Sequence, residues 1–315
     1  SCIKRYFYNK YMNILVCGAN GQLGRELRSL APVSVHRYFF SDIAASDAGE
    51  TLPLDICDRE GVRKALADND IDILINCAAF TDVEGAEDRP ELAERLNGYA
   101  PAVLAEAVKE RGGLLVHIST DYVFGMDSGN RPLAEESSGS PCGVYGLSKL
   151  HGEQAVTASG CRHLILRTAW LYSEYGRNFV KTILRLSAEK PQIKVVFDQC
   201  GSPTYALDLA EAIFTIVEKG LYEGREGIYN YSNEGVCSWY DFAVEIAAAS
   251  GHDKCAIVPC HSDEFPSKVT RPPYSVLDKS KFKKCFGLEI PHWRQSLLKC
   301  LSGKSMLQIA QETKK

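Results

Sequence analysis

Short apolar runs alternate along this chain with longer amphipathic stretches. The run Asn13–Cys17 predicts a buried strand, and similar runs at residues 71–77, 114–118 and 164–166 predict three more. Helical patterns lie between them, one behind the predicted N-cap Asp58 and a long one that Pro90 opens. Strands that alternate with helices favour an α/β fold, a Rossmann-type doubly wound parallel sheet.

The alternation becomes less regular after about Trp170, which indicates a smaller C-terminal α/β region. We expect a Rossmann domain at residues 12–170, to which residues 195–220 return, and the smaller region at residues 171–194 and 221–301. Residues 1–11 are expected to be an N-terminal extension, and residues 302–315 a C-terminal tail.

Composition excludes several classes of protein. The chain has 315 residues and a net charge of −4, which argues against a dedicated nucleic-acid binder. No apolar stretch is long enough for a transmembrane helix, so no membrane partner is expected, and the first eleven residues do not have the pattern of a signal peptide. The 12 cysteines include no C-x-x-C pair, so no zinc or thioredoxin-like site is predicted. We therefore expect a reducing, cytoplasmic location.

A glycine-rich loop joins the first predicted strand to the first predicted helix. Its sequence, GANGQLG, has the spacing G-x-x-G-x-x-G. Such glycines permit a tight turn, close approach of the backbone to a pyrophosphate, and close packing of the helix on the strand, while the helix N-terminus adds partial positive charge. The alternative is a simple glycine-rich turn. The predicted dinucleotide contacts are Gly18, Asn20, Gly21, Gln22, Leu23 and Gly24.

Residues near later strand ends extend this prediction. Asp42 follows the second predicted strand, at residues 33–40, where a carboxylate binds ribose hydroxyls and disfavours a 2′-phosphate. A solvated loop aspartate is the alternative, and Arg25 or Arg37 would instead contact a 2′-phosphate, so the choice between NADH and NADPH stays open. The other predicted cofactor contacts follow apolar runs and are Asp55, Ile56, Ala78 and Ala79.

Tyr145 and Lys149 are four residues apart on a predicted helix, so their side chains share one face. A nearby ammonium, together with a cationic nicotinamide, stabilises tyrosinate and is expected to lower the pKa of the phenol from about 10, which suits proton exchange with a reacting oxygen. Tyr145 and Lys149 are therefore predicted to bind the cofactor as well. The spacing alone is common by chance. Thr120, however, follows a core strand at the end where open parallel sheets place ligands. We predict that Thr120, Tyr145 and Lys149 are catalytic.

Five segments together carry a resemblance to a known family. They are ISTDYVFG at 118–125, VYGLSKLHGE at 144–153, LRTAWLY at 166–172, NFVKT at 178–182 and DQCGSPT at 198–204. With them the chain resembles the dTDP-4-dehydrorhamnose reductase family of the extended short-chain dehydrogenase/reductase superfamily, from about Met12 to Leu301.

The resemblance implies reduction of the 4-keto group of dTDP-4-dehydro-L-rhamnose to dTDP-L-rhamnose by NADPH or NADH. It implies that Tyr145 donates the proton, that Lys149 holds the nicotinamide ribose and that Thr120 hydrogen-bonds to the reacting oxygen. The smaller region would bind substrate. The alternatives are that Trp170 is a core residue, that Lys181 lies at a solvated helix end and that Arg271 is a surface arginine. The implied sugar-nucleotide contacts are Thr120, Asp121, Tyr122, Trp170, Asn178, Lys181, Gln199, Pro203, Thr204 and Arg271.

Some members of that family dimerise around a magnesium ion held by glutamates. Glu26 matches one such position, but the others fall near Leu207 and Cys300, neither of which is a ligand for a hard cation. The sequence therefore predicts no metal site, and it leaves monomer and homodimer open.

Two other functions remain as alternatives. One is a nucleotide-sugar epimerase or 4,6-dehydratase of the same superfamily; dehydratases follow the strand-end threonine with Asp-Glu, whereas Tyr122 follows Asp121 here. The other is a catalytically silent nucleotide-binding regulatory subunit, which intact Thr120, Tyr145 and Lys149 disfavour.

Overall fold

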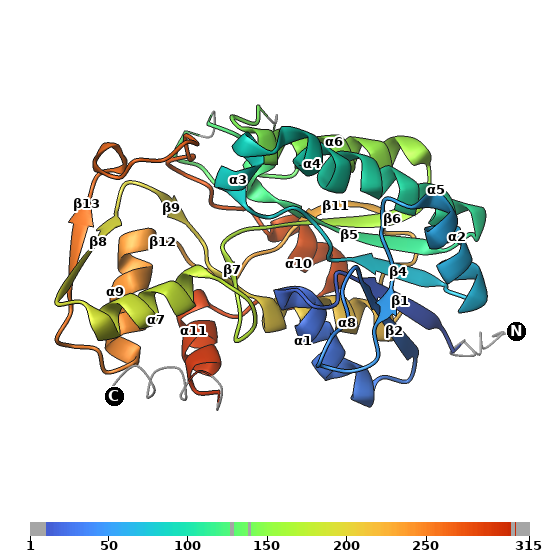
Figure 1. The fold of residues 1–315 in the computed structure, drawn as a ribbon, viewed down its shortest axis with the longest axis horizontal. Coiled ribbons are helices and arrows are strands. Elements are labelled where there is room, and N and C mark those ends of the chain that lie inside the picture. The colour runs from blue at the N-terminus through green and yellow to red at the C-terminus, as the bar shows by residue number, and fades with distance from the viewer. Residues whose placement is uncertain (1–10, 127–128, 138–139, 304–305, 307–315) are drawn as a thin grey trace, which may run out of the picture.

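A parallel sheet of seven strands forms the larger part of the fold (Figure 1). The computed structural model describes residues 11–126, 129–137, 140–303 and 306. The strand order is β11-β6-β5-β4-β1-β2-β3, so the chain reverses its direction of growth between β1 and β4. The strands are β1 Asn13–Cys17, β2 Arg37–Asp42, β3 Leu52–Pro53, β4 Ile73–Asn76, β5 Leu114–Thr120, β6 Arg162–Thr168 and β11 Gly227–Asn230.

The central strand β1 shows why these runs are apolar throughout. Its register places Val16 between Phe40 of β2 and Ile75 of β4. Ile14 and Val16 face one apolar cluster, whereas Leu15 and Cys17 face another, because successive side chains of a strand point to opposite faces. Both faces of the sheet are therefore covered, as expected of a parallel sheet.

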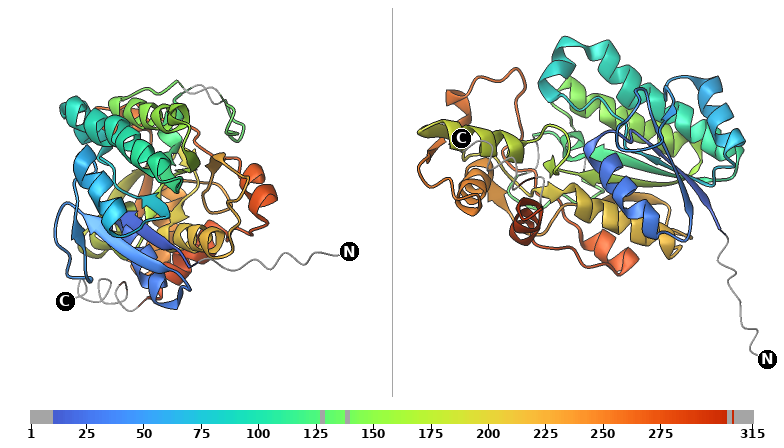
Figure 2. Two further views of the ribbon diagram at one scale, coloured as in Figure 1. Left: turned by 90° about the vertical axis from the view of Figure 1, so that its right-hand side faces the viewer. Right: turned by 60° about the horizontal axis from the view of Figure 1, so that its bottom comes forward.

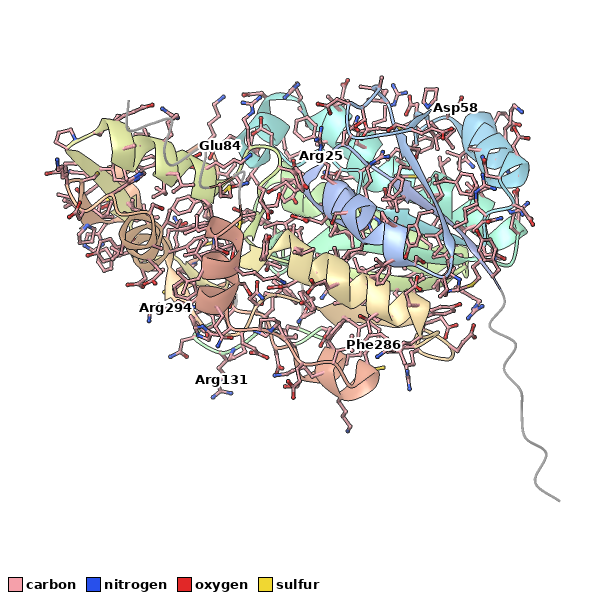
Figure 3. The ribbon with its side chains drawn as sticks, turned by 90° about the horizontal axis from the view of Figure 1, so that it is seen from below. Arg25, Asp58, Glu84, Arg131, Phe286 and Arg294 are labelled. Carbon is pink, nitrogen blue, oxygen red and sulfur yellow. The ribbon has the colours of Figure 1, made fainter. Side chains whose placement is uncertain are left out.

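Helices cover both faces of the sheet, and Figures 1 and 2 show α5 and α6 on one side and α1 and α8 on the other. Phe286 of α10 packs with the α1 and α8 side (Figure 3). The helices of this part are α1 Gln22–Leu30, α2 Arg59–Asp68, α3 Val83–Asp88, α4 Pro90–Glu94, α5 Ala100–Glu110, α6 Val144–Ser159, α8 Ala206–Glu218 and α10 Ser280–Phe286.

The smaller part has an apolar cluster of its own, and Figure 1 shows it beside the large sheet. Its strands form three short pairs, β10 with β7, β12 with β9 and β13 with β8. Its elements are β7 Leu171–Tyr172, α7 Phe179–Glu189, β8 Gln192–Val196, β9 Cys200–Gly201, β10 Thr204–Tyr205, β12 Cys237–Ser238, α9 Trp239–Ala249, β13 Ala256–Cys260 and α11 Trp293–Leu301.

The chain divides between the two parts differently from the sequence expectation. Residues 221–301 were expected in the smaller region, but β11 pairs with β6 at the edge of the large sheet, and α10 packs beneath that sheet. Of residues 195–220, only α8 returns to the large sheet, whereas Val195 pairs with β13. Apolar runs predict burial but do not predict the partner strand. Most of the expected extension and tail lies outside the described residues.

Local predictions differ in detail. The second strand is β2, Arg37–Asp42, and not residues 33–40, because a 3₁₀ turn occupies Ala31–Val33. Asp58 is the N-cap of α2, although its side chain makes no capping hydrogen bond. The helical pattern opened by Pro90 is α4, a π-helical turn at Arg95–Tyr99 and α5 in succession. Within the part of the chain that the structure describes, no helix has the length and apolar character needed to cross a membrane.

Candidate functional site

A cavity of about 870 Å³ lies along the carboxyl ends of the central strands. Its lining includes Gly18 after β1, Asp42 of β2, Cys77 after β4, Thr120 of β5 and Thr168 of β6. Trp170 and Trp239 line it as well, so the smaller part supplies one wall. Parallel sheets bind ligands in this crevice, where the strand order reverses.

The glycine loop has the backbone form that a dinucleotide site needs. Gly18 has a φ of 74°, and a Cβ there would lie 2.5 Å from the backbone nitrogen of Ala78. A Cβ on Gly24 would lie 2.3 Å from the carbonyl oxygen of Gly18, so Gly24 serves close packing and does not line the cavity. Gly21 caps α1 without a side-chain bond, and the first turn has no acidic residue. Backbone N–H groups at this helix end are therefore suited to a pyrophosphate.

Asp42 lies at the cavity, held by two backbone N–H groups. Its carboxylate accepts hydrogen bonds from the backbone of Asn20 at 3.0 Å and of Ile43 at 2.8 Å. The Asn20 side chain is turned toward the carbonyl of Ala44 and is not part of the lining. Gln22, Leu23, Asp55, Ile56, Ala78 and Ala79 line the cavity as the sequence predicts.

Neither arginine considered for a 2′-phosphate reaches the cavity lining. Arg25 donates to Asp47 at 3.1 Å and to the carbonyl of Asn20. Arg37 begins β2, at the end of the strand opposite to Asp42, and lies over the ring of Phe39. Of Arg25, Arg37 and Asp42, only Asp42 lines the cavity.

Thr120, Tyr145 and Lys149 meet in the cavity from two elements. Thr120 ends β5, while Tyr145 and Lys149 lie one turn apart on α6. The helix is held close to the π-helical turn, where a Cβ on Gly152 would lie 2.1 Å from the carbonyl oxygen of Asn97. The ammonium of Lys149 donates to the carbonyl of Ile118 on β5 at 2.6 Å. This hydrogen bond joins the helix to the strand that carries Thr120.

The pKa of Tyr145 differs from the sequence expectation. Burial raises it above the usual value of a phenol, and the hydrogen bond with Thr120 only partly opposes this shift. Desolvation disfavours tyrosinate and is the largest cause of the shift, while the ammonium of Lys149 is directed at the carbonyl of Ile118. Tyr145 is therefore a protonated phenol at neutral pH, which is the state that a proton donor requires.

Asp121, Tyr122 and Arg271 form the next part of the lining. Burial raises the pKa of Asp121 to about 6, and its carboxylate accepts from the Thr120 hydroxyl at 3.1 Å. Arg271 donates to the Tyr122 hydroxyl at 3.3 Å and pairs with Glu84 at 3.4 Å. The arginine predicted to bind phosphate thus lies at the cavity, already oriented by two side chains.

Trp170 has a strained backbone and a stacked partner. Its φ is 50°, in a region that non-glycine residues seldom adopt. The indole stacks on Trp239 with ring centroids 3.5 Å apart and planes 10° apart. A Cβ on Gly201 would lie 2.7 Å from the Trp170 ring. The glycine and Trp239 together fix Trp170 as a flat wall of the cavity, and local strain of this kind is concentrated at functional sites.

The structure does not bring all predicted substrate contacts to the cavity lining. Asn178 caps α7 and donates to Gln22 at 3.1 Å, and Gln199 donates to Ser262 at 2.9 Å. Pro203 and Thr204 are buried at β10, where Thr204 pairs with β7. These positions support the loops around the cavity. Lys181 also lies outside the lining.

Several lining residues were not among the predicted site residues, and Trp239 and Arg177 carry the chemistry most relevant to a ligand. Trp239 starts α9, some distance along the chain from every motif considered, so only the tertiary fold reveals it. Arg177 precedes Asn178 in the loop over Gln22 and adds an exposed cation to the lining. A basic residue next to a motif was the available signal for Arg177, but it does not distinguish a ligand from a solvated side chain.

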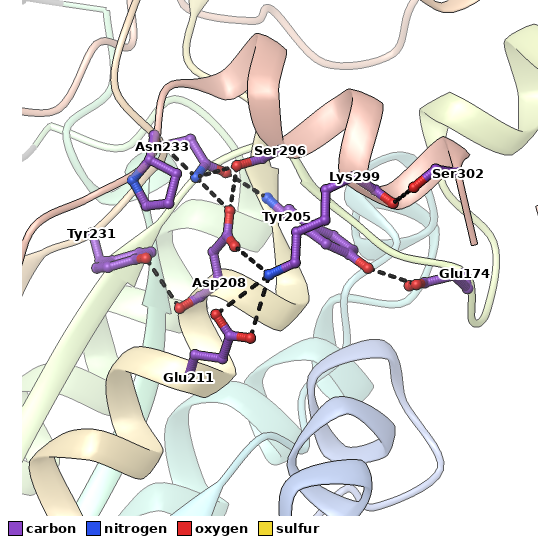
Figure 4. Close-up of polar contacts among 10 residues, drawn as sticks. Glu174, Tyr205, Asp208, Glu211, Tyr231, Asn233, Ser296, Lys299 and Ser302 are labelled. Carbon is purple, nitrogen blue, oxygen red and sulfur yellow. Dashed lines mark hydrogen bonds and ion pairs between the residues drawn. The ribbon is translucent and has the colours of Figure 1, made fainter.

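The residues around Glu26 do not fit a magnesium ion. Burial and the neighbouring carboxyl of Glu174 raise the pKa of Glu26 to about 9, so Glu26 is protonated at neutral pH. Glu174 accepts from the Tyr205 hydroxyl at 2.5 Å, and Lys299 lies 3.3 Å from Glu211 (Figure 4). Across the residues whose placement is described, no group of three or more acidic, histidine or cysteine side chains is arranged for a metal.

Comparisons with known proteins agree with this geometry. The family model described as RmlD substrate binding domain matches residues 12–306. The spore coat polysaccharide biosynthesis protein SpsK of Bacillus subtilis (strain 168) is 38% identical over 293 residues, which are 93% of this chain and 98% of the relative. The dTDP-4-dehydrorhamnose reductase of Burkholderia thailandensis is 37% identical over 308 residues, covering 92% of this chain and 98% of that protein.

Solved structures show the same similarity. The crystal structure of dTDP-4-dehydrorhamnose reductase from Bacillus anthracis in complex with NADP is 35% identical, with a TM-score of 0.84. The match covers 92% of this chain and 99% of that chain. The glycine loop, the strand-end cavity and the smaller part thus belong to one architecture shared over nearly the whole length.

Proposed function

The chain belongs to the RmlD substrate binding domain family, which includes dTDP-4-dehydrorhamnose reductases, and we infer from this membership and from its site what the protein does. It is an NAD(P)H-dependent oxidoreductase that reduces the 4-keto group of dTDP-4-dehydro-L-rhamnose to give dTDP-L-rhamnose, in dTDP-rhamnose biosynthesis. The observation that carries this assignment is the meeting of Thr120, Tyr145 and Lys149 in the cavity that the glycine loop borders.

Bound NAD(P)H supplies the hydride, which adds to the carbonyl carbon of the sugar. Tyr145 supplies the proton to the oxygen of that carbonyl, and its raised pKa keeps the phenol protonated until the oxygen becomes basic. Hydride and proton together convert the ketone to a secondary alcohol.

Thr120 and Lys149 orient this proton transfer. The Thr120 hydroxyl has one proton, which it gives to Asp121 here, so it can contact a substrate oxygen as a donor only by leaving that carboxylate. Lys149 carries positive charge next to the cofactor position and is held by β5. A fixed cation at this point stabilises the negative charge that develops on the oxygen.

The wall opposite the glycine loop supports a sugar-nucleotide substrate. We propose that the stacked Trp170 and Trp239 present their flat faces to the apolar side of the sugar or base, and that Arg271 binds the diphosphate. A planar guanidinium suits two phosphate oxygens at once, and Tyr122 and Glu84 hold it at the cavity.

We also propose a cytoplasmic location. The cysteines Cys17, Cys57, Cys77, Cys142, Cys161, Cys200, Cys237, Cys255, Cys260, Cys285 and Cys300 are all free thiols, as expected in a reducing compartment. A homodimer remains a proposal that light scattering of the purified protein would decide.

Oxidation of NADH and of NADPH, measured separately with dTDP-4-dehydro-L-rhamnose, tests the function. We expect one dTDP-L-rhamnose to form for each NADH or NADPH oxidised, and only when cofactor, enzyme and ketone are all present. Absence of net cofactor oxidation would contradict the reductase and favour an epimerase. Cofactor binding without turnover of this or related 4-keto sugar nucleotides would favour the regulatory subunit.

A further inference from the structure

A buried ion pair lies directly behind the catalytic lysine. Glu153 follows Lys149 by four residues on α6, so Tyr145, Lys149 and Glu153 lie on the same face of this helix. Lys149 is 3% exposed and Glu153 is 2% exposed. Charged residues with so little exposure are rare unless they are paired. Here the carboxylate of Glu153 is paired with the guanidinium of Arg167.

Two neighbouring strands fix the carboxylate of Glu153. Arg167 of β6 donates to it through Nε at 2.9 Å and through Nη2 at 2.7 Å, a bidentate pair. Ser119 of β5 donates its hydroxyl to Oε1 at 2.5 Å. Because Ser119 and Arg167 are register partners in the sheet, the carboxylate is held at one place relative to β5.

Lys149 is joined to the same piece of β5. Its Nζ donates to the carbonyl of Ile118, the residue before Ser119 and two before Thr120. Ile118 therefore contacts the lysine and Ser119 contacts the glutamate, and Thr120 is the next residue of the strand. A displacement of Glu153 would be transmitted to Lys149 through both the helix and the strand.

The charged and titratable groups around Lys149 leave Glu153 as its supporting anion. Burial lowers the pKa of Lys149 to about 8, and Glu153 and Cys77 act against that lowering. The pKa of the Cys77 thiol, after β4, is raised by burial, so the thiol stays neutral. On β5, burial keeps His117 neutral by lowering its pKa. On α6, Tyr145 is also neutral.

We propose that Glu153 is a positioning residue for Lys149. Its carboxylate, clamped by Arg167 and Ser119, supplies the fixed negative charge that keeps the buried lysine protonated in the reductase reaction. This role rests on the proposed function, since it matters only if the Lys149 ammonium works on Tyr145 and the cofactor. It adds a fourth member to the trio of Thr120, Tyr145 and Lys149.

Glu153→Gln tests the role through a pH profile. Removing the anion lowers the pKa of Lys149 further, so the alkaline limb of kcat/KM moves to lower pH. A unit charge roughly 6 Å away, the spacing of i, i+4 side chains, acts through an effective dielectric of about 20 and gives a shift of about one to two pH units. The variant therefore loses about 10–100-fold more activity at pH values above both limbs than at pH values below both limbs.

Arg167→Met is the matched control. It breaks the same buried ion pair and is expected to lower Tm as Glu153→Gln does, but it leaves the carboxylate beside Lys149. Its alkaline limb is expected to stay at the wild-type position or to move to higher pH, since a positive charge has been removed. A purely structural role of the pair would move both variants alike.

The double variant Glu153→Gln, Arg167→Met covers the case in which a single variant fails to fold, because it removes both partners of the Glu153–Arg167 ion pair together. The alkaline limb of kcat/KM of this double variant is expected at lower pH than that of the wild type. The proposal would be overturned if the alkaline limb of the double variant stayed at the wild-type pH. It would also be overturned if the alkaline limbs of both single variants moved by the same amount. If the wild-type protein does not reduce the ketone, the proposed function fails. The role of Glu153 is then decided by whether the pH at which NADH affinity falls moves down in the double variant.

Discussion

Tyr145→Phe is the change that tests the proposed chemistry most directly. It removes one hydroxyl and keeps the ring, which packs edge-to-face on Tyr122 with centroids 5.4 Å apart and planes 77° apart. The loss of the hydrogen bond with Thr120 costs about 1 kcal/mol of stability, so the variant is expected to fold. The perturbation is therefore confined to the proton donor.

The size of the effect depends on what could replace Tyr145. General acid catalysis contributes about 10²–10⁴-fold, or about 2.7–5.4 kcal/mol of barrier. Thr120 gives its proton to Asp121, and Lys149 is directed at the carbonyl of Ile118. Neither is placed to donate in its stead, so we expect a loss toward the upper end, about 10³–10⁴-fold in kcat.

The assay follows cofactor oxidation in single turnovers, which separates chemistry from product release. Cofactor affinity, measured independently by fluorescence, is expected to change by less than about threefold, because the variant loses one hydroxyl and keeps both the ring and Lys149. Tyr122→Phe is the control, since it removes a hydroxyl from the same cavity that contacts Arg271. Its kcat is expected to fall by less than about tenfold.

A kcat for Tyr145→Phe within about fivefold of wild type would refute the reasoning. So would an equal loss in Tyr122→Phe, because the effect would then belong to the cavity and not to the proton donor.

Three further predictions concern the cofactor and the substrate wall. Asp42→Asn removes the carboxylate at the expected ribose position, so the ratio of kcat/KM for NADPH to that for NADH is expected to rise about tenfold, and an unchanged ratio would count against this placement. Gly24→Ala places a Cβ 2.3 Å from the carbonyl oxygen of Gly18, so thermal unfolding is expected to show a loss of about 1–3 kcal/mol together with a raised KM for cofactor; a variant as stable as wild type would contradict the close packing. Trp239→Ala removes the stacking partner of Trp170 and is expected to raise the KM for substrate about 3–10-fold with cofactor affinity unchanged, and a change in cofactor affinity alone would reverse the assignment.

The core of the fold was predictable because its signals are local. The apolar runs of β1, β4, β5 and β6 occur in chain order with helices between them, and a parallel sheet is the architecture that buries such runs on both faces. The position of β11 was not predictable from the same signals. Residues 227–230 are separated from β6 by all of α7 and α8, and only tertiary packing selects β6 as their partner.

The site was predictable where one motif carries both backbone and chemistry. The spacing of the glycines predicts the backbone conformation of the loop. The four-residue spacing of Tyr145 and Lys149 places both side chains on one face of α6. Trp239 could not be predicted, since it reaches the cavity from α9 by the packing of the smaller part. Thr204 lies in a motif shared with the family but is buried in β10, where it pairs with β7. A residue of such a motif therefore serves packing in one case and ligand contact in another.

Protonation states show where sequence spacing is insufficient. The spacing of Tyr145 and Lys149 predicts a tyrosine with a lowered pKa, whereas the folded chain raises it by burial and turns the ammonium toward Ile118. Of Tyr145 and Lys149, the lysine, with its pKa lowered to about 8, is therefore the group that titrates nearer to neutral pH. Loss of reductase activity as pH rises through about 8 then reports deprotonation of Lys149 and not of Tyr145. Burial lowers the pKa of that lysine and so brings the upper pH limit down, and the negative charge of Glu153 opposes this shift.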